Sequence, residues 1–447
     1  MEKSECPVCG KRTKMESMLY WCDECNIPIY EEICPICGRE GKHFTSDARP
    51  VFPEERLLIE VILGKPFAFI NDSVWNGSGN RYYVNGKKIS FSVAKLNELN
   101  ASEIRDQLNK FKDQNDYSSF ERYIALWVNA NKGHFDFITT EAKQYIIDYS
   151  QKFINDDSNS AFVSFSGGKD STVVSDLVRK ALSNPSIIHI FGNTTLEFPY
   201  TYDYIQSFRE KNKKTPLLRA ENKEQDFFSL CEVFGPPSRS LRWCCTIFKT
   251  GFIGEKIRRT FGDEKAVLTF YGIRRSESTS RNNYERSSQG KKISKQRVAS
   301  PIIDWQDYDI WLYLLTTNID FNYAYRLGYT RVGCWCCPNN SAWSQFLSEV
   351  YLPEQTERFR DILLRFAKKM GKENPEEYVT SGGWKARQGG AGIELSKNVA
   401  IEFKPCATDA KSFNYELNKP ITPELYELFK PFGSGSVCRA CRVAFTL

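Results

Sequence analysis

Residues 164–172, Ser-Phe-Ser-Gly-Gly-Lys-Asp-Ser-Thr, combine the residue types that bind phosphate groups in proteins. Gly167 and Gly168 would let backbone N–H groups close on phosphate oxygens, and a helix beginning after them would add its favourable N-terminal field. Lys169 supplies positive charge, whereas Asp170 is expected to order the loop or to bind a magnesium ion. The spacing differs from that of the Walker-type loop. We predict a phosphate-binding loop formed by Ser164, Ser166, Gly167, Gly168, Lys169, Asp170, Ser171 and Thr172.

Residues 1–45 carry three Cys-x-x-Cys pairs, and thiolates at this spacing present two sulfurs to one ion. Two such pairs complete a tetrahedral zinc site, and a ribbon of this size folds with its metal. Fifteen cysteines in a chain without a recognisable export signal also favour metal or catalytic thiols over disulfides. The spacing leaves open which two pairs share the ion, and the third pair could form half of a second site with His43. The candidate zinc ligands are Cys6, Cys9, Cys22, Cys25, Cys34 and Cys37.

An alternation of strands and helices begins near residue 131 and must position the phosphate-binding loop. Strand patterns cover residues 161–165, 187–191, 216–218 and 266–271, and a helical pattern covers residues 171–182. Strands separated by helices predict an α/β fold with a doubly wound parallel sheet. The ligand crevice of such a sheet lies outside the carboxyl ends of its strands, which is where the loop falls.

The whole chain is expected to divide into four parts. These are a zinc ribbon at 1–45, a small β-containing accessory module at 46–130, the doubly wound domain at 131–350 and a C-terminal helical region with a cysteine-containing tail at 351–447. In the accessory module, Asn76-Gly77 and Asn85-Gly86 predict hairpin turns. This module shows no catalytic pattern, so we expect it to bind a partner or to act as a spacer.

The Ser-Gly-Gly-Lys-Asp-Ser run resembles the signature of the PP-loop ATP pyrophosphatases, the adenine nucleotide α-hydrolase superfamily. Residues 193–199 resemble a segment of the phosphoadenylyl-sulfate (PAPS) reductases, with Asn193 and Thr195 in place of the family's Asp and Gly. Residues 271–278, which include Gly272, Arg274 and Arg275, resemble another. The resemblance covers residues 160–345 and implies a site for ATP or an adenylyl sulfate that also involves Asn193 and Gly272. It further implies catalytic roles for Lys169, Asp170, Arg274 and Arg275, although the two arginines could instead be surface charges.

A second set of cysteines, Cys244-Cys245 followed by Cys334-x-x-Cys337, resembles the ligand pattern of the iron–sulfur adenylyl-sulfate reductases. Thiolates suit a four-iron–four-sulfur cluster, so we predict that these four residues bind one. Zinc and buried free thiols are the alternatives. The extra thiol of Cys336 leaves the full ligand set open.

The tail cysteines Cys438 and Cys441 occupy a position comparable to that of the C-terminal catalytic cysteine of PAPS reductases. The Glu before that cysteine and the Gly-x-His after it are absent here. We predict that Cys438 or Cys441 carries sulfur, with a structural or metal-binding pair that includes Cys406 as the alternative. Neighbouring arginines would lower the pKa of either thiol if they lie close in space.

The formal net charge of +6 is concentrated in residues 274–297, which hold eight Lys or Arg and two Glu. Such a segment predicts an attraction for phosphates or a larger polyanion, or else a solvated basic loop. No stretch is apolar enough to span a membrane, and the N-terminus does not read as a secretory signal, so a cytoplasmic location is expected.

Three functions are compatible with these residues. In the first, the enzyme adenylates its substrate with ATP, and sulfur is then transferred to nucleic acid; residues 242–244 and 274–281 resemble the C component of the DNA phosphorothioation systems. This function would need a sulfur donor, such as a cysteine desulfurase-like protein. In the second, a thiol takes the sulfite group of PAPS or adenylyl sulfate. In the third, the chain is a nucleotide-binding scaffold without catalysis. We favour the first.

Overall fold

The structure, a computed structural model, describes residues 18–91, 96, 99–154, 160–239, 241–262, 266–278, 281–290 and 296–385. Near the two ends of the chain it also describes short strands: β1 (Ser4–Glu5), β2 (Arg12–Thr13), β16 (Ile401–Pro405), β17 (Phe413–Leu417), β18 (Ser434–Ser436) and β19 (Ala444–Thr446). The chain forms two compact units, residues 1–237 with 241–375 and residues 238–240 with 376–447. All the contacts described below lie within the first unit.

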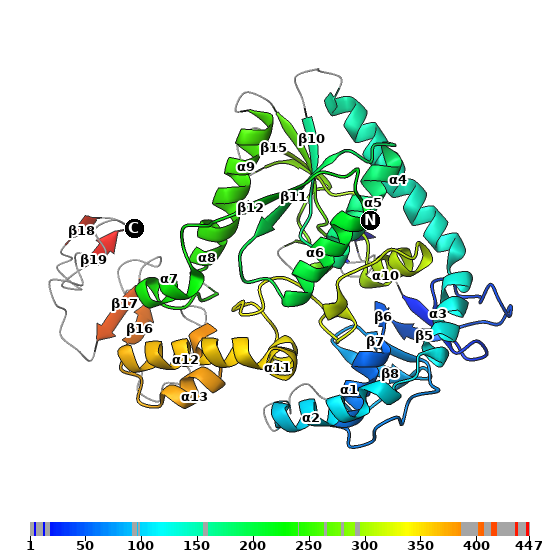
Figure 1. Ribbon diagram of the computed structural model, residues 1–447, viewed down its shortest axis with the longest axis horizontal. Helices are drawn as coiled ribbons and strands as arrows, with labels where there is room; N and C mark the ends of the chain where they lie inside the picture. Colours follow the sequence, from blue (N-terminus) through cyan, green and yellow to red (C-terminus); the bar gives the residue numbers. More distant parts are fainter. Residues whose placement is uncertain are drawn as a thin grey trace. The chain divides into compact units, whose positions relative to one another are not determined.

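A six-stranded sheet forms the centre of the first unit (Figure 1). Its strand order is β12 (Leu217–Glu221), β11 (Ile188–Asn193), β10 (Ser160–Ser164), β13 (Val267–Phe270), β15 (Gln296–Ala299) and β14 (Ser287–Gln289). The first five strands are parallel, and β14 is an antiparallel edge strand. The order reverses between β10 and β13, so the predicted doubly wound parallel sheet is confirmed. The sequence patterns did not reveal the short strands β14 and β15.

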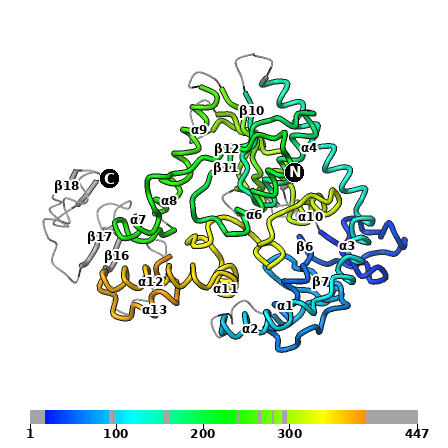
Figure 2. The backbone as a smooth tube through the Cα atoms, viewed as in Figure 1, coloured from blue at the N-terminus to red at the C-terminus, as the bar shows by residue number. Residues whose placement is uncertain are grey.

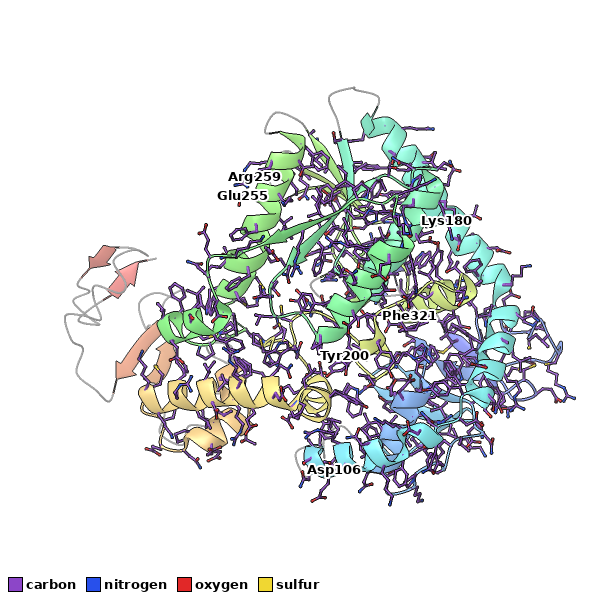
Figure 3. The ribbon with its side chains drawn as sticks, viewed as in Figure 1. Asp106, Lys180, Tyr200, Glu255, Arg259 and Phe321 are labelled. Carbon is purple, nitrogen blue, oxygen red and sulfur yellow. The ribbon has the colours of Figure 1, made fainter. Side chains whose placement is uncertain are left out.

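Side chains of successive strand residues point to opposite faces of the sheet. Both faces carry apolar side chains, and helices cover both of them. Phe162 and Ile190 pack with Ile257 of α9 (Gly251–Phe261). Val163, on the other face, packs with apolar residues of α5 (Lys169–Ala181). The outer side of α9 is polar, and its Glu255 and Arg259 lie together there (Figure 3) and form an ion pair of 2.5 Å.

The other helices of the described residues complete the unit. They are α1 (Pro53–Ile62), α2 (Ala101–Phe111), α3 (Ser118–Ala130), α4 (Lys132–Ile154), α6 (Pro199–Lys211), α7 (Phe227–Phe234), α8 (Trp243–Cys245), α10 (Asp307–Thr316), α11 (Ala342–Tyr351) and α12 (Pro353–Lys369). All residues of α13 (Pro375–Thr380) except Pro375 belong to the second unit. None of the helices that the structure describes is long and apolar enough to cross a membrane.

Two small antiparallel sheets precede the central sheet. One contains β3 (Leu19–Cys22), β4 (Ile27–Ile29) and β5 (Lys42–Thr45), and the other contains β6 (Ala48–Pro50), β7 (Val74–Gly77), β8 (Arg81–Val84) and β9 (Lys87–Lys88). Asn85 and Gly86 form the expected turn, with φ of +50° and +75°. The turn predicted at Asn76-Gly77 is wrong. These two residues end β7 and pair with residues of both β6 and β8, and the positive φ values fall on Gly79 and Asn80.

The accessory module shares a core with the doubly wound domain. Trp127 of α3 packs between Trp75 of β7 and Tyr308 of α10, with ring centroids 5.2 Å apart in both pairs. All three side chains are almost completely buried. Figure 2 shows the blue segment of the accessory module beside the yellow-green segment around α10, although the two are far apart in the sequence. The described residues of the accessory module therefore pack against α10 within the same unit.

Candidate functional site

The predicted phosphate-binding loop lies where the strand order reverses. It follows β10, which ends at Ser164, and leads into α5, whose N-cap is Gly168. Gly167 has a φ of +72°, a conformation that glycine adopts at little cost. The hydroxyl groups of Ser171 and Thr172 donate to the carbonyl of Gly168, at 2.9 and 3.1 Å. The loop is therefore held in shape by its own side chains.

Ser166 belongs to the same internal network. Its hydroxyl lies 3.1 Å from the hydroxyl of Ser171, and its backbone N–H donates to the Ser171 hydroxyl at 3.2 Å. The phenol oxygen of Tyr325 accepts a hydrogen bond from the backbone N–H of Lys169 at 2.9 Å. This bond satisfies one of the backbone N–H groups in the first turn of α5, which have no partner within the helix. All the predicted loop residues therefore converge on the N-terminus of one helix at the carboxyl edge of the sheet, where a phosphate would meet N–H donors and the helix dipole.

Lys169 is buried, with 4% of its surface exposed, and its Nζ lies among three oxygen atoms. These are Oδ2 of Asp170 at 3.4 Å, Oδ1 of Asp307 at 3.3 Å and the carbonyl oxygen of Thr330 at 3.2 Å. Burial disfavours the ammonium form, but the carboxylates of Asp170 and Asp307 outweigh it, so the pKa of Lys169 is raised. The site thus holds a permanent cation at the loop.

Arg274 completes a charged network around the loop. Its Nε donates to Oδ1 of Asp170 at 2.5 Å, and its Nη2 donates to Oδ1 of Asp307 at 2.7 Å. Burial opposes ionisation of Asp170 and Asp307, but Arg274 and Lys169 outweigh it and lower the pKa of both carboxyl groups. Because each oxygen of Asp170 faces a protein cation, the geometry fits the loop-ordering role of Asp170 and does not fit a magnesium ligand.

Gly272 lies where the segment after β13 crosses the start of α5. A Cβ atom at this position would be 2.7 Å from the carbonyl carbon of Asp170 and 2.8 Å from the backbone nitrogen of Ser171. The two backbone segments can therefore touch only with glycine here. Arg275 points away from this contact. It forms an ion pair with Asp304 and donates to the carbonyl of Tyr284 at 3.0 Å, so it stays outside the network of Arg274.

Asp47 is a member of the site that sequence reasoning missed. Its carboxylate accepts from the backbone N–H groups of Asp307 at 3.1 Å and Tyr308 at 2.9 Å, and so caps α10 from the accessory module. Nothing in the local sequence signals this contact, because the partners are about 260 positions apart. Burial and the neighbouring charge of Asp307 raise the pKa of Asp47 to about 7.

We expect Asp47→Asn to become more stable relative to the wild type as the pH rises from about 4 to about 7. The folded protein binds the Asp47 proton more tightly than the unfolded chain, so the wild type loses unfolding free energy over this interval, by about 3–4 kcal/mol. The variant has no proton to lose. Urea unfolding of both proteins at several pH values would measure this, and a constant difference across the interval would contradict the shifted pKa.

Asn193 and its neighbours form the loop that follows β11. The Asn193 amide donates to Glu221 at 2.8 Å and accepts from the backbone N–H of Thr195 at 3.1 Å and from the hydroxyl of Tyr202 at 2.9 Å. The Asn193 side chain therefore stabilises the loop that follows β11 through these three hydrogen bonds. Thr195 has a φ of +63°, which agrees with the glycine that the PAPS reductase segment has at this position.

The structure resolves which cysteine pairs of the ribbon come together. The sulfurs of Cys22, Cys25, Cys34 and Cys37 all lie within 4.8 Å of one another, with 3.5 Å between Cys22 and Cys37 and 3.8 Å between Cys25 and Cys34. This donor set fits a tetrahedral zinc ion. His43 stacks on Tyr20 at 5.2 Å between ring centroids. Cys6 and Cys9 lie outside the described residues.

Cys34→Ser is expected to remove one zinc ion per chain, since three thiolates and a hydroxyl bind zinc far more weakly than four thiolates. The metal content of the purified variant, measured by mass spectrometry, checks this. Cys231→Ser is the matched control, because Cys231 is a buried thiol outside the cluster. Equal zinc contents in the wild type and Cys34→Ser would contradict the assignment.

One member of the second cysteine set, Cys334, lies beside the loop after β11. The Cys334 sulfur lies 3.3 Å from the hydroxyl of Thr194, and Trp335 donates its backbone N–H to Leu196 at 3.1 Å. The adjacent thiol of Cys245 and burial raise the pKa of Cys244, and Cys334 is near enough to raise it further. Within the described part of the chain, these cysteines do not form a single-ion cluster. The thiolates of a four-iron cluster bind different irons and so stand farther apart.

The basic segment is more internally paired than its composition suggests. Arg274, Arg275, Arg281 and Arg286 each form an ion pair, with Asp170, Asp304, Glu277 and Glu141 respectively. Arg286 also stacks over Tyr145. These four arginines serve the fold, so they do not by themselves form an open patch for a polyanion. The tail residues Cys406, Cys438 and Cys441 lie outside the described residues.

The fold and the loop define a doubly wound α/β domain with a glycine-containing turn at its switch point. Residues 160–340 match the family model of the phosphoadenosine phosphosulfate reductase domain.

Several known proteins are similar to the chain. An uncharacterized protein of Methanocaldococcus jannaschii is 32% identical over 270 residues, which are 60% of this chain and 54% of that protein. A second one from the same organism is 33% identical over 50% of this chain and 51% of its own length. The chain thus spans about half the length of these relatives. The adenosine 5′-phosphosulfate reductase of Bacillus anthracis is 27% identical over 38% of this chain and 72% of that enzyme.

Similarity to solved structures is weaker. A phosphoadenylyl-sulfate reductase from Candida auris covers 46% of this chain and 97% of its own, with 16% identity and a TM-score of 0.34. An NH3-dependent NAD synthetase from Campylobacter jejuni covers 57% and 98%, with 13% identity and a TM-score of 0.30.

Proposed function

We propose that the protein binds ATP on residues 164–172, transfers the adenylyl group to its substrate with release of pyrophosphate, and supports sulfur transfer to nucleic acid. One observation carries the proposal: the buried cation of Lys169 stands beside the N-terminus of α5 at the switch point of the sheet. Negative charge that develops on departing pyrophosphate would be stabilised there by fixed donors. Arg274 acts through Asp170 and Asp307, by holding Lys169 and the loop in place.

We propose that the second cysteine set, Cys244, Cys245, Cys334 and Cys337, takes part in the transfer of sulfur. Cys244, Cys245, Cys334 and Cys337 have the donor type for a four-iron–four-sulfur cluster, which would supply thiophilic coordination next to the nucleotide loop. Cys438 and Cys441 are the proposed sulfur-carrying thiols, and a cysteine desulfurase-like protein is the proposed donor. Anaerobic purification followed by iron, sulfide and zinc analysis tests the cluster. About four irons and four sulfides per chain are expected, whereas zinc without sulfide would overturn it.

A second function has support from one relative. The adenosine 5′-phosphosulfate reductase of Bacillus anthracis matches the same region, so the loop could bind a sulfonucleotide whose sulfite group a thiol then takes. Against this, the C-terminal motif of those reductases is incomplete in residues 438–441. A catalytically inactive scaffold is the third candidate.

A pyrophosphate-release assay separates the three functions. Release that requires both ATP and a polynucleotide is the expected result. Sulfite production from adenylyl sulfate or PAPS, with a dithiol as the reductant and without ATP, would favour the reductase, and no turnover of any of these substrates would favour the scaffold. The assay is run on anaerobically purified full-length protein with magnesium, since magnesium accompanies nucleotide phosphates.

A further inference from the structure

Residues 330–335 form a short strap between the two loops of the candidate site. At the start of the strap, the carbonyl oxygen of Thr330 accepts from Nζ of Lys169, in the loop after β10, at 3.2 Å. At its end, the backbone N–H of Trp335 donates to the carbonyl of Leu196, in the loop after β11, at 3.1 Å. The strap therefore lies at the carboxyl edge of the sheet, where the ligand crevice of a doubly wound fold is found.

Arg331 is the second residue of this strap, and its side chain is exposed. Among the residues that the structure describes, no carboxylate or carbonyl group forms an ion pair or hydrogen bond with its guanidinium. The strap borders open space, since a Cβ atom at Gly333 would meet no atom within 4 Å. The strap thus holds an exposed cation one residue away from the contact that Thr330 makes with the buried Lys169.

Arg281 is a second cation near Arg331. It is partly buried and forms an ion pair with Glu277, whose carboxylate also accepts from the backbone N–H of Arg274 at 3.2 Å. Burial lowers the pKa of Arg281, and the positive charge of Arg331 lowers it further. The two guanidinium groups therefore repel each other, and Glu277 compensates only Arg281. An anion beside both arginines would remove this repulsion.

A bound nucleoside triphosphate would supply such an anion. The N-terminus of α5 and the Lys169 ammonium group are suited to the phosphates at the buried end of the site. A γ-phosphate lies farther along the chain of phosphates, and the exposed guanidinium of Arg331 can bind it through two parallel hydrogen bonds. Adenylyl sulfate has a sulfate in place of the β-phosphate and no group in place of the γ-phosphate.

We propose that Arg331 binds the γ-phosphate of ATP and so makes the site select a nucleoside triphosphate over a sulfonucleotide. The proposal rests on the proposed function, because it takes ATP as the ligand of residues 164–172. It adds a specificity-determining residue that lies outside both the loop and the basic segment 274–297. Arg281 supports Arg331 by adding a second positive charge beside the phosphate.

The test compares the affinities of the full-length protein for ATP, ADP and adenylyl sulfate, measured by calorimetry with magnesium and without polynucleotide. ATP and ADP differ only in the γ-phosphate, so their comparison isolates the group that Arg331 is proposed to bind. The variant is Arg331→Met. Arg259→Met is the matched control, because Arg259 lies on the outer side of α9 (Figure 3) with 75% of its side chain exposed.

We expect Arg331→Met to bind ATP about tenfold more weakly than the wild type, and to bind ADP and adenylyl sulfate within about twofold of it. Arg259→Met should bind all three like the wild type. An unchanged affinity for ATP, an equal loss for ADP, or no binding of ATP by the wild type would overturn the proposal. Weaker binding of a single-stranded oligonucleotide by Arg331→Met, with unchanged binding of ATP, would place Arg331 on the acceptor strand and overturn it too.

The proposed function fails by a different result. A tenfold loss of ATP affinity in Arg331→Met, in a protein that releases no pyrophosphate, would support the role of Arg331 and refute adenylyl transfer. Polynucleotide-dependent pyrophosphate release, with wild-type ATP affinity in Arg331→Met, would refute only the role of Arg331.

Discussion

Arg274→Met is expected to lower the free energy of unfolding by about 3 kcal/mol or more, because it removes the cation that Asp170 and Asp307 share. The guanidinium is 4% exposed, and its partners are 15% and 24% exposed, so water compensates the two carboxylates poorly. The pKa values of both carboxyl groups are lowered by this arginine. Without it, they must either stay charged with Lys169 alone or take up protons.

Urea unfolding measures this effect, and the neighbouring Arg275→Met provides the control. Arg275 pairs with Asp304 at the partly exposed edge of the same segment, where an ion pair contributes at most about 1 kcal/mol. A large loss for Arg274→Met and a small one for Arg275→Met is the expected outcome. Similar values for the two variants would show that the network around Asp170 does not depend on Arg274.

Lys169→Met is expected to reduce nucleotide turnover by about 100-fold or more, the usual effect of removing one preorganised donor for a developing anion. Methionine retains an apolar stem of similar length in this buried position, and Arg274 still compensates Asp307. The variant should therefore fold. Steady-state pyrophosphate release, with circular dichroism to verify folding, makes the comparison.

Lys180→Met is the control for Lys169→Met, since Lys180 lies on the outer side of the same helix (Figure 3). Lys180 pairs with Asp176 at 2.7 Å and keeps 49% of its side chain exposed. Its loss should leave turnover within about twofold of the wild type, because screened surface charges act weakly. Full turnover by Lys169→Met would mean that residues 164–172 are not the phosphate site.

Local sequence predicted the central features of the fold well. The apolar strand before residue 164 and the helical period after it placed the loop between β10 and α5, since both signals span only a few residues. The Cys-x-x-Cys spacing likewise predicted a metal site in the ribbon, and the structure was needed to show that Cys22, Cys25, Cys34 and Cys37 come together. In both cases the residues that carry the information lie close together in the chain.

The features that the sequence did not reveal depend on long-range packing. Asp47 caps α10 because β6 packs beside that helix, and no local pattern encodes this contact. Arg274 and Arg275 are adjacent and identical in type, yet one is buried in the loop network and the other pairs with Asp304. The Asn76-Gly77 signal failed because pairing with two neighbouring strands outweighed the turn preference of the dipeptide.

The central claim is that the loop directs cleavage between the α- and β-phosphates of ATP. The most direct measurement uses ATP labelled at its α-phosphate, incubated with anaerobically purified protein, magnesium and a polynucleotide. We expect the label to appear in AMP or in an adenylylated acceptor, with one pyrophosphate released for each, and we expect Lys169→Met to form almost none of either product. Label recovered as ADP with inorganic phosphate would contradict it, because the bond broken would then be the one between the β- and γ-phosphates.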